Sequence, residues 1–139
     1  MNTIAPTRPT ELRTCRFRLA AAPAAAAQAR RQVRSAIAAW GVDVDADVAV
    51  LLTSELVTNA IRAQAGGAIA LAVSCCFGQL RVDVHDTSRR WPALVDAPAG
   101  AEAGRGLMLV ATLSATWGVY RTAGGKAVYF TLPSRPDLA

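Results

Sequence analysis

The sequence predicts an α+β fold, a two-layer α/β sandwich in which a mixed, mostly antiparallel sheet carries helices on one face. Its 139 residues suit a single domain. Hydrophobic residues make up 53% and charged residues 18%, which excludes a disordered or fibrous chain. The predicted order is strand, helix, helix, strand, strand, helix, strand, strand, which is typical of a sheet covered on one face. We assign the domain to residues 12–134, between tails at 1–11 and 135–139.

The sequence of the first half of the domain predicts one strand and two helices. Residues 12–19 alternate between polar and apolar side chains, which predicts a strand. An amphipathic helix is predicted over 24–40, because Pro23 suits a first helical turn and Gly41 suits a helix end. Residues 43–64 predict a second helix, with acidic residues near its positive end and a glycine pair after it.

The second half predicts four strands and one short helix. Two strands are expected to share a two-residue turn of Gly78 and Gln79, and the last two strands close a hairpin. Residues 89–103 contain two prolines and no regular period, which is typical of a loop. In chain order, the predicted elements are strands 69–77 and 80–85, helix 107–113, and strands 116–120 and 126–132.

Composition excludes several kinds of function. The net charge is +5, but the positive charges are scattered and only one of them is a lysine, so we expect no direct binding of nucleic acid. The cysteines Cys15, Cys75 and Cys76 predict neither a disulfide framework nor a zinc site, and a reducing, cytoplasmic location is expected. No segment has the roughly 20 apolar residues of a membrane span, so no membrane contact is expected.

The predicted second helix carries the sharpest chemical signal. Glu55 and Asn59 are four residues apart, so they are neighbours on one helical face, among leucines. An unpaired buried polar group costs about 1–3 kcal/mol, so both side chains need partners. Two interpretations stay open. Either Glu55 pairs with an arginine while Asn59 crosslinks a loop, or the two supply a general base and a ligand for a divalent metal.

Two further segments carry groups that a ligand can use. Asp86 ends a predicted strand, where an aspartate commonly forms a turn. As a site residue it would accept a hydrogen bond from an exocyclic amine, which is one way to select adenine over guanine. The segment Gly104-Arg105-Gly106 opens the short helix. Free N–H groups and the helix dipole favour an anion there, although a simple turn before a helix explains the glycines as well.

Together these segments resemble the motifs of the Bergerat-fold ATPases, the group that holds gyrase and the histidine kinases. Residues 52–62, LTSELVTNAIR, resemble the N box of that group. Residues 86–88 resemble a modified first glycine box, 104–110 the second, and 125–130 the final strand. More narrowly, the chain resembles short actinobacterial ATP-binding proteins related to the anti-sigma-factor serine kinases. The resemblance covers residues 14–133 and implies the Bergerat ATP-binding fold.

The resemblance also implies a role for each site residue. Glu55 would be the catalytic base, and Asn59 would hold the Mg²⁺ that bridges the phosphates of ATP. Asp86 would bind the adenine amine, with Thr131 assisting through a water molecule. The residues that would bind the phosphates are Gly104, Arg105, Gly106 and Leu107.

The activity implied by the resemblance is transfer of phosphate from ATP to a serine of a small STAS-type anti-anti-sigma protein, with a sigma factor as competing partner. Three departures from the family pattern favour an alternative. Residues 87–90 replace glycines of the first box, Ala63-Gln64 replaces a histidine, and the lid at 93–103 is short. The alternative is a non-catalytic module that binds a regulatory partner, with ATP as a structural ligand or without it. Homodimer formation also stays open.

Overall fold

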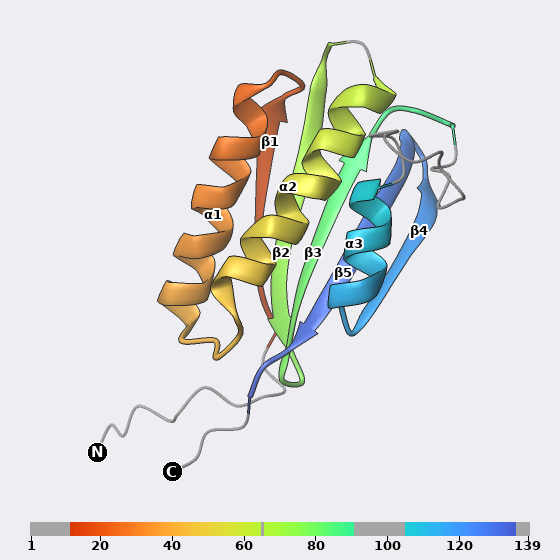
Figure 1. The fold of residues 1–139 in the computed structure, drawn as a ribbon. Helices are drawn as coiled ribbons and strands as arrows, with labels where there is room; N and C mark the ends of the chain where they lie inside the picture. The colour runs from red at the N-terminus through yellow and green to blue at the C-terminus, as the bar shows by residue number, and fades with distance from the viewer. Residues whose placement is uncertain (1–11, 65, 91–104, 136–139) are drawn as a thin grey trace.

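The computed structural model describes residues 12–64, 66–90 and 105–135. Within them the elements follow the predicted order. Figure 1 shows the two layers, with the helices lying against one face of the sheet. In chain order the elements are β1 (Arg13–Ala20), α1 (Ala24–Trp40), α2 (Ala46–Ala63), β2 (Ala68–Cys76), β3 (Gln79–Asp86), α3 (Arg105–Leu113), β4 (Thr116–Thr122) and β5 (Gly125–Pro133).

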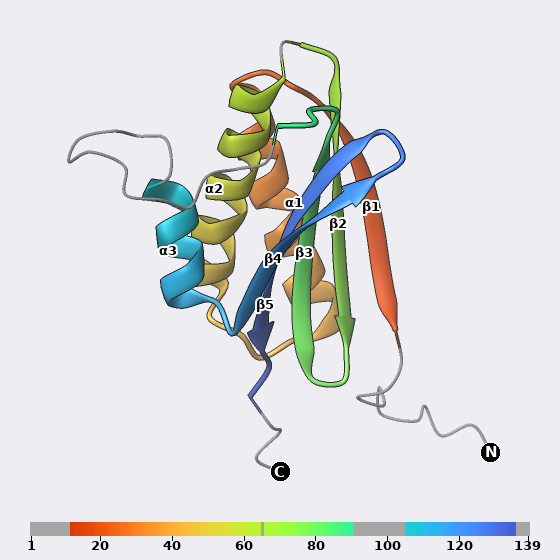
Figure 2. The ribbon, with the colours of Figure 1, turned by 90° about the vertical axis from the view of Figure 1, so that its right-hand side faces the viewer.

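The sheet has the strand order β1-β2-β3-β5-β4. Each of these strand pairs is antiparallel, so the α+β sandwich is confirmed and its described sheet is antiparallel throughout. Helices α1, α2 and α3 all cover the same face (Figures 1 and 2). We call the other face of the sheet the open face.

Alternation along the strands decides which side chains face the helices. In β3, Val82 and Val84 are buried in the core, whereas His85 is half-buried on the open face. The same alternation places Asp86 on the helix side. Its partner in the register is Lys126 of β5. The end of β3 therefore brings two charged side chains to the covered side of the sheet.

Helix α2 lies in the middle of the helical layer and contacts both α1 and α3. Its N-cap is Asp45, whose side chain accepts hydrogen bonds from the backbone N–H groups of Asp47 and Val48. Leu52 and Leu56 are fully buried, and burial of such a side chain contributes about 1.5–3 kcal/mol.

The turn between β2 and β3 lies one residue earlier than predicted. Cys76 pairs with Gln79, so Phe77 and Gly78 form the turn, with φ angles of 55° and 72°. A type I′ turn needs positive φ at both central residues and favours glycine at the second. That preference explains why the turn is Phe77-Gly78 and not Gly78-Gln79.

The chain after β5 is tied to the rest of the fold. The backbone N–H of Ser134 donates to the carbonyl of Gly78 at 2.6 Å, and that of Arg135 donates to the carbonyl of Asp43 at 2.8 Å. Arg135 therefore extends the ordered contacts one residue past the predicted domain end at 134. The predicted tail at 1–11 and residues 136–139 lie outside the described residues. Among the described helices, none has the length and apolar character needed to cross a membrane.

Candidate functional site

The two polar residues of α2 stand at the edge of the core. Glu55 and Asn59 are half-buried and lie one helical turn apart, next to the buried Leu52 and Leu56. Between described residues, the structure shows no ion pair from an arginine to Glu55. The interpretation of Glu55 as a purely structural ion-pair partner therefore gains no support from this part of the chain.

The start of α3 lies directly against Glu55. A Cβ atom built on Gly106 would overlap Glu55 Oε2 and would stand 3.3 Å from both Cβ and Cδ of that side chain. The absence of a side chain at Gly106 leaves room for the Glu55 carboxylate in this position. The carboxylate of Glu55 is thus placed beside the first turn of a helix, where backbone N–H groups lack helical partners.

The rest of the predicted phosphate-binding segment is described in part. Arg105 is the first residue of α3, and Gly104 and the predicted lid at 93–103 lie outside the described residues. The side chain of Leu107 is only 2% exposed and belongs to the core. Leu107 can therefore contribute to ligand binding only through its backbone.

The carboxylate of Asp86 is held by a lysine. Lys126 Nζ donates to Asp86 Oδ1 at 2.9 Å and to Oδ2 at 2.8 Å, and both side chains are only 1% exposed. The backbone N–H of Ser88 donates to Oδ1 at 2.8 Å. The residue predicted to accept the adenine amine thus already has three donors, two of them from a charged group.

A glycine permits this arrangement of β3 and β5. A Cβ atom on Gly125 would overlap the carbonyl oxygen of Asp86 and would stand 2.7 Å from Thr87 Cα. The two strand ends therefore approach one another more closely than any other residue at 125 would allow. Because of this approach, the side chain of the next residue, Lys126, meets Asp86 across the ladder.

Sequence reasoning missed Lys126 as a site residue, although a signal was present. Lys126, Val128 and Phe130 alternate along β5, and the other two face the core. The only lysine of the chain thus occupies a core-facing position. Because a buried charge needs an opposite charge, this pattern predicts an acidic partner on the neighbouring strand.

Gln64 is a second residue that sequence reasoning missed. Its Nε2 donates to the carbonyl oxygens of Gly66 at 2.8 Å and Ala68 at 3.1 Å. Its Oε1 accepts from Thr87 N at 2.8 Å and Thr87 Oγ1 at 3.2 Å. Gln64 therefore links the end of α2 to the segment that follows Asp86.

The structure does not bring Thr131 to Asp86, so the predicted assistance through a water molecule is not supported. Thr131 pairs with Arg81, whereas Lys126 pairs with Asp86. Five residues along a strand span about 16 Å, and an odd separation places the two side chains on opposite faces. On the open face, Thr131 Oγ1 shares a hydrogen bond of 2.6 Å with Thr116 Oγ1.

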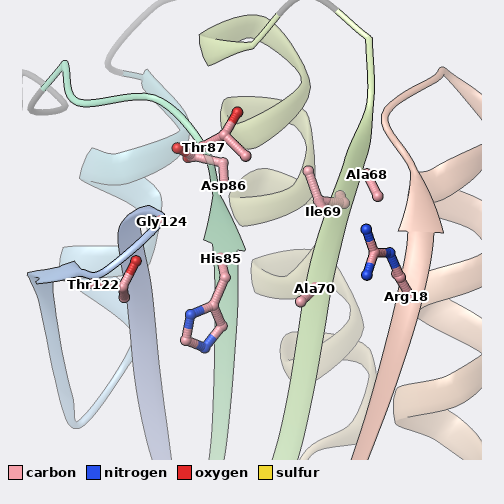
Figure 3. Close-up of a pocket in the computed structure, with 9 residues that line it drawn as sticks. All are labelled: Arg18, Ala68, Ile69, Ala70, His85, Asp86, Thr87, Thr122 and Gly124. Atoms are coloured by element: carbon pink, nitrogen blue, oxygen red, sulfur yellow. The ribbon is translucent and has the colours of Figure 1, made fainter.

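A hollow of about 210 Å³ lies on the open face, at the end of the sheet that carries Asp86. Nine residues line it (Figure 3), and among them Arg18, Ala70, His85 and Thr122 come from four different strands. Asp86 and Thr87 also line this hollow, although the Asp86 carboxylate is hydrogen-bonded to Lys126 on the helix side of the sheet.

A second charged cluster occupies the open face. Arg81 binds Asp83 through two hydrogen bonds of 2.8 and 2.9 Å, and the hydroxyl of Tyr120 donates to Asp83 at 2.7 Å. The Arg81 guanidinium also lies 4.0 Å from the ring centroid of Tyr129. Burial, followed by the hydrogen bond to Asp83, raises the pKa of Tyr120 to about 12. This cluster satisfies its own charges and stands apart from Glu55.

The side chains of the candidate site suit a metal ion whose ligands are mostly water molecules and substrate phosphates. Among the described residues, no three His, Cys, Asp or Glu side chains are grouped closely enough to hold a metal ion. Mg²⁺ commonly keeps several waters and takes one or two protein ligands together with substrate phosphates. The amide oxygen of Asn59 is a suitable protein ligand of that kind, and the Glu55 carboxylate is its neighbour on the helix.

The chain matches a known protein family and a solved structure. Residues 19–132 match a family model described as the histidine kinase-like ATPase domain. A crystal structure of the RsbU and RsbW domains of Rv1364c from Mycobacterium tuberculosis matches with a TM-score of 0.67 and 26% sequence identity. The match covers 89% of this chain and 33% of the Rv1364c chain. This chain therefore spans about one third of the length of the matched chain. No curated protein matches the sequence.

Proposed function

Because the chain belongs to the histidine kinase-like ATPase domain family, we propose that it is an ATP-binding, anti-sigma-type regulator that phosphorylates a serine of an anti-anti-sigma partner. The observation that carries the proposal is the contact between Glu55 and Gly106. It sets a carboxylate beside the start of a helix, and Asn59 lies one turn further along α2. A base, an oxygen ligand and backbone donors thus lie on two neighbouring elements.

Each residue would have one task in this reaction. ATP would supply the phosphoryl group, and Asn59 would hold the Mg²⁺ that would neutralise charge on the phosphates. Glu55 accepts the proton of the serine hydroxyl at a carboxylate oxygen. Gly106 leaves its N–H group and the neighbouring backbone accessible, which suits the positioning that phosphoryl transfer requires.

The partners that we propose follow from the family resemblance and the matched structure. An RsbW domain is part of the matched structure, and the match covers 89% of this chain. We propose a STAS-type anti-anti-sigma protein as the phosphorylated partner and a sigma factor as its competitor. Phosphorylation would lower the affinity for the first partner and leave the kinase free to bind the second.

A specific observation favours a second candidate function, a regulatory module that does not transfer phosphate. The Asp86 carboxylate is already bound by Lys126 and Ser88. A nucleotide would then be held mainly through its phosphates, or the partner would bind without nucleotide.

The two candidates differ in a direct measurement. The protein is incubated with Mg²⁺, radiolabelled ATP and a STAS-type anti-anti-sigma protein from the same organism. The kinase proposal expects a labelled serine, loss of labelling in Glu55→Gln, and full labelling in Asp47→Asn, which changes an exposed acid at the start of the same helix. Calorimetric titration with ATP and Mg²⁺ should show that Glu55→Gln still binds.

The outcomes separate the alternatives. Undiminished labelling in Glu55→Gln overturns the role of Glu55 as base. ATP binding without any labelled partner supports the non-catalytic module. Absence of heat in the titration, combined with unlabelled partner, overturns nucleotide binding and with it the kinase proposal.

A further inference from the structure

The ion pair of Asp86 and Lys126 bears on which base the proposed nucleotide site accepts, so the inference below rests on the proposed function. Both side chains are on the helix side of the sheet and only 1% exposed. A carboxylate that reads a nucleobase amine needs a free oxygen lone pair that the base can reach. Three hydrogen bonds already reach the Asp86 carboxylate.

The hydrogen bonds use most of the capacity of the carboxylate. An ionised carboxylate has about four acceptor sites on its two oxygens. Lys126 Nζ and Ser88 N both donate to Oδ1, and Lys126 Nζ also donates to Oδ2. One acceptor site is left on Oδ2, beside an ammonium group that has a third proton to donate.

The remaining acceptor site of Asp86 and the third ammonium proton of Lys126, taken together, do not distinguish adenine from guanine. A free carboxylate attracts the exocyclic amine of adenine and disfavours the carbonyl oxygen that guanine has at the same position. Here the lysine has neutralised the charge and adds a donor beside the remaining acceptor. An amine and a carbonyl would therefore find equally suitable partners, and neither would find a free carboxylate.

The ion pair has little freedom to open. Asp86 and Lys126 are partners in the β3–β5 ladder, and Gly125 lies against the backbone of Asp86 and Thr87. A base amine that displaced the lysine would leave its ammonium group without its buried partner, which is strongly unfavourable. The nucleobase therefore does not take the place of the lysine.

We propose that Lys126 is a specificity-determining residue, which occupies the Asp86 carboxylate in place of a nucleobase amine. The chain then binds purine nucleoside triphosphates through the phosphates and sugar and does not select adenine. Replacement of the lysine by a small residue should create adenine selectivity, whereas replacement by an apolar residue of similar length should not, because the space stays filled.

The experiment compares ATP and GTP, each with Mg²⁺, by calorimetric titration of the full chain. For the unaltered protein, we expect dissociation constants within about threefold of each other, since no buried polar group of the site is left unpaired by either base. For Lys126→Ala, we expect ATP to bind at least about tenfold more tightly than GTP, because the carboxylate is then exposed to the amine. Lys126→Met should retain the weak discrimination of the unaltered protein.

Both variants leave a buried carboxylate without its charged partner, so circular dichroism first verifies that they are folded. The measurement on the unaltered protein tests the proposal even when a variant does not fold. A tenfold or greater preference of that protein for ATP overturns the inference and leaves the proposed function intact. Binding of neither triphosphate overturns the proposed function itself, which is a different and recognisable result.

Discussion

The carboxylate of Glu55 occupies the space that a side chain at Gly106 would need. The atom in closest approach is the far end of a flexible side chain, so Glu55 can rotate away from an added methyl group. In Gly106→Ala we expect stability to change by less than about 1 kcal/mol, because alanine also favours the helix. Phosphotransfer should fall about 100-fold, since the base is displaced. Urea unfolding and partner labelling measure the two effects.

The control for this substitution is Gly124→Ala. No heavy atom lies within 4 Å of a Cβ built there, and its backbone needs no glycine conformation. Stability and labelling should both remain at the level of the unaltered protein. Equal labelling by Gly106→Ala and Gly124→Ala would contradict a catalytic role for the Glu55 carboxylate at this position.

Gly125→Ala should behave differently from Gly106→Ala. An added Cβ would overlap the backbone of Asp86 and Thr87, and a backbone cannot rotate out of the way as a side chain does. We expect a loss of about 3 kcal/mol in the free energy of unfolding, from strand separation and strain in the buried ion pair. Urea denaturation measures this loss, with the adjacent Gly124→Ala expected to lie within about 0.5 kcal/mol of the unaltered protein.

The link between Gln64 and Thr87 can be tested by hydrogen exchange. Gln64→Ala removes the acceptor of the Thr87 backbone N–H, and a hydrogen bond is worth about 1 kcal/mol net. The Thr87 amide should therefore exchange several-fold faster in two-dimensional NMR. Gln64→Glu retains an acceptor oxygen and should keep Thr87 protected. Unchanged protection in Gln64→Ala would show that Gln64 does not hold this segment.

Tyr120 gives the fold a specific dependence on alkaline pH. Burial and the hydrogen bond to Asp83 raise the pKa of Tyr120 to about 12, from an ordinary value of about 10. The neutral tyrosine therefore stabilises the fold below about pH 10, and this contribution is lost as the pH rises toward 12. Urea unfolding at a series of pH values should show the advantage over Tyr120→Phe shrinking across that interval. Parallel curves for the two proteins would contradict the assignment.

Local patterns predicted most of the fold. Alternation predicted β1 and the core-facing sides of the sheet, and Gly41 ends α1 with a φ of 62°, as its position indicated. The turn at Phe77-Gly78 was misplaced by one residue, because the position of a turn depends on strand pairing as well as on glycine content.

The site was harder to predict than the fold. The contact between Glu55 and Gly106 joins residues that are 51 positions apart in the sequence. The family resemblance assigned both residues to one ATP site but did not predict their contact. Resemblance to a motif transfers residue types but not register, which is why Thr131 was linked to Asp86 from the wrong face of the sheet. Lys126 was overlooked because lysine is usually exposed, and only its place in the alternation of β5 shows otherwise.

Side chains along β5 alternate between the helix-covered face and the open face of the sheet, and this alternation limits how the chain can vary in length. Val128 lies in the core, and Tyr129 stacks with Arg81 on the open face. A single inserted residue before Lys126 would shift the strand by one step and send each of these side chains to the opposite side of the sheet. Insertions and deletions should therefore be tolerated in connecting segments and rejected within β5, even where individual substitutions are accepted.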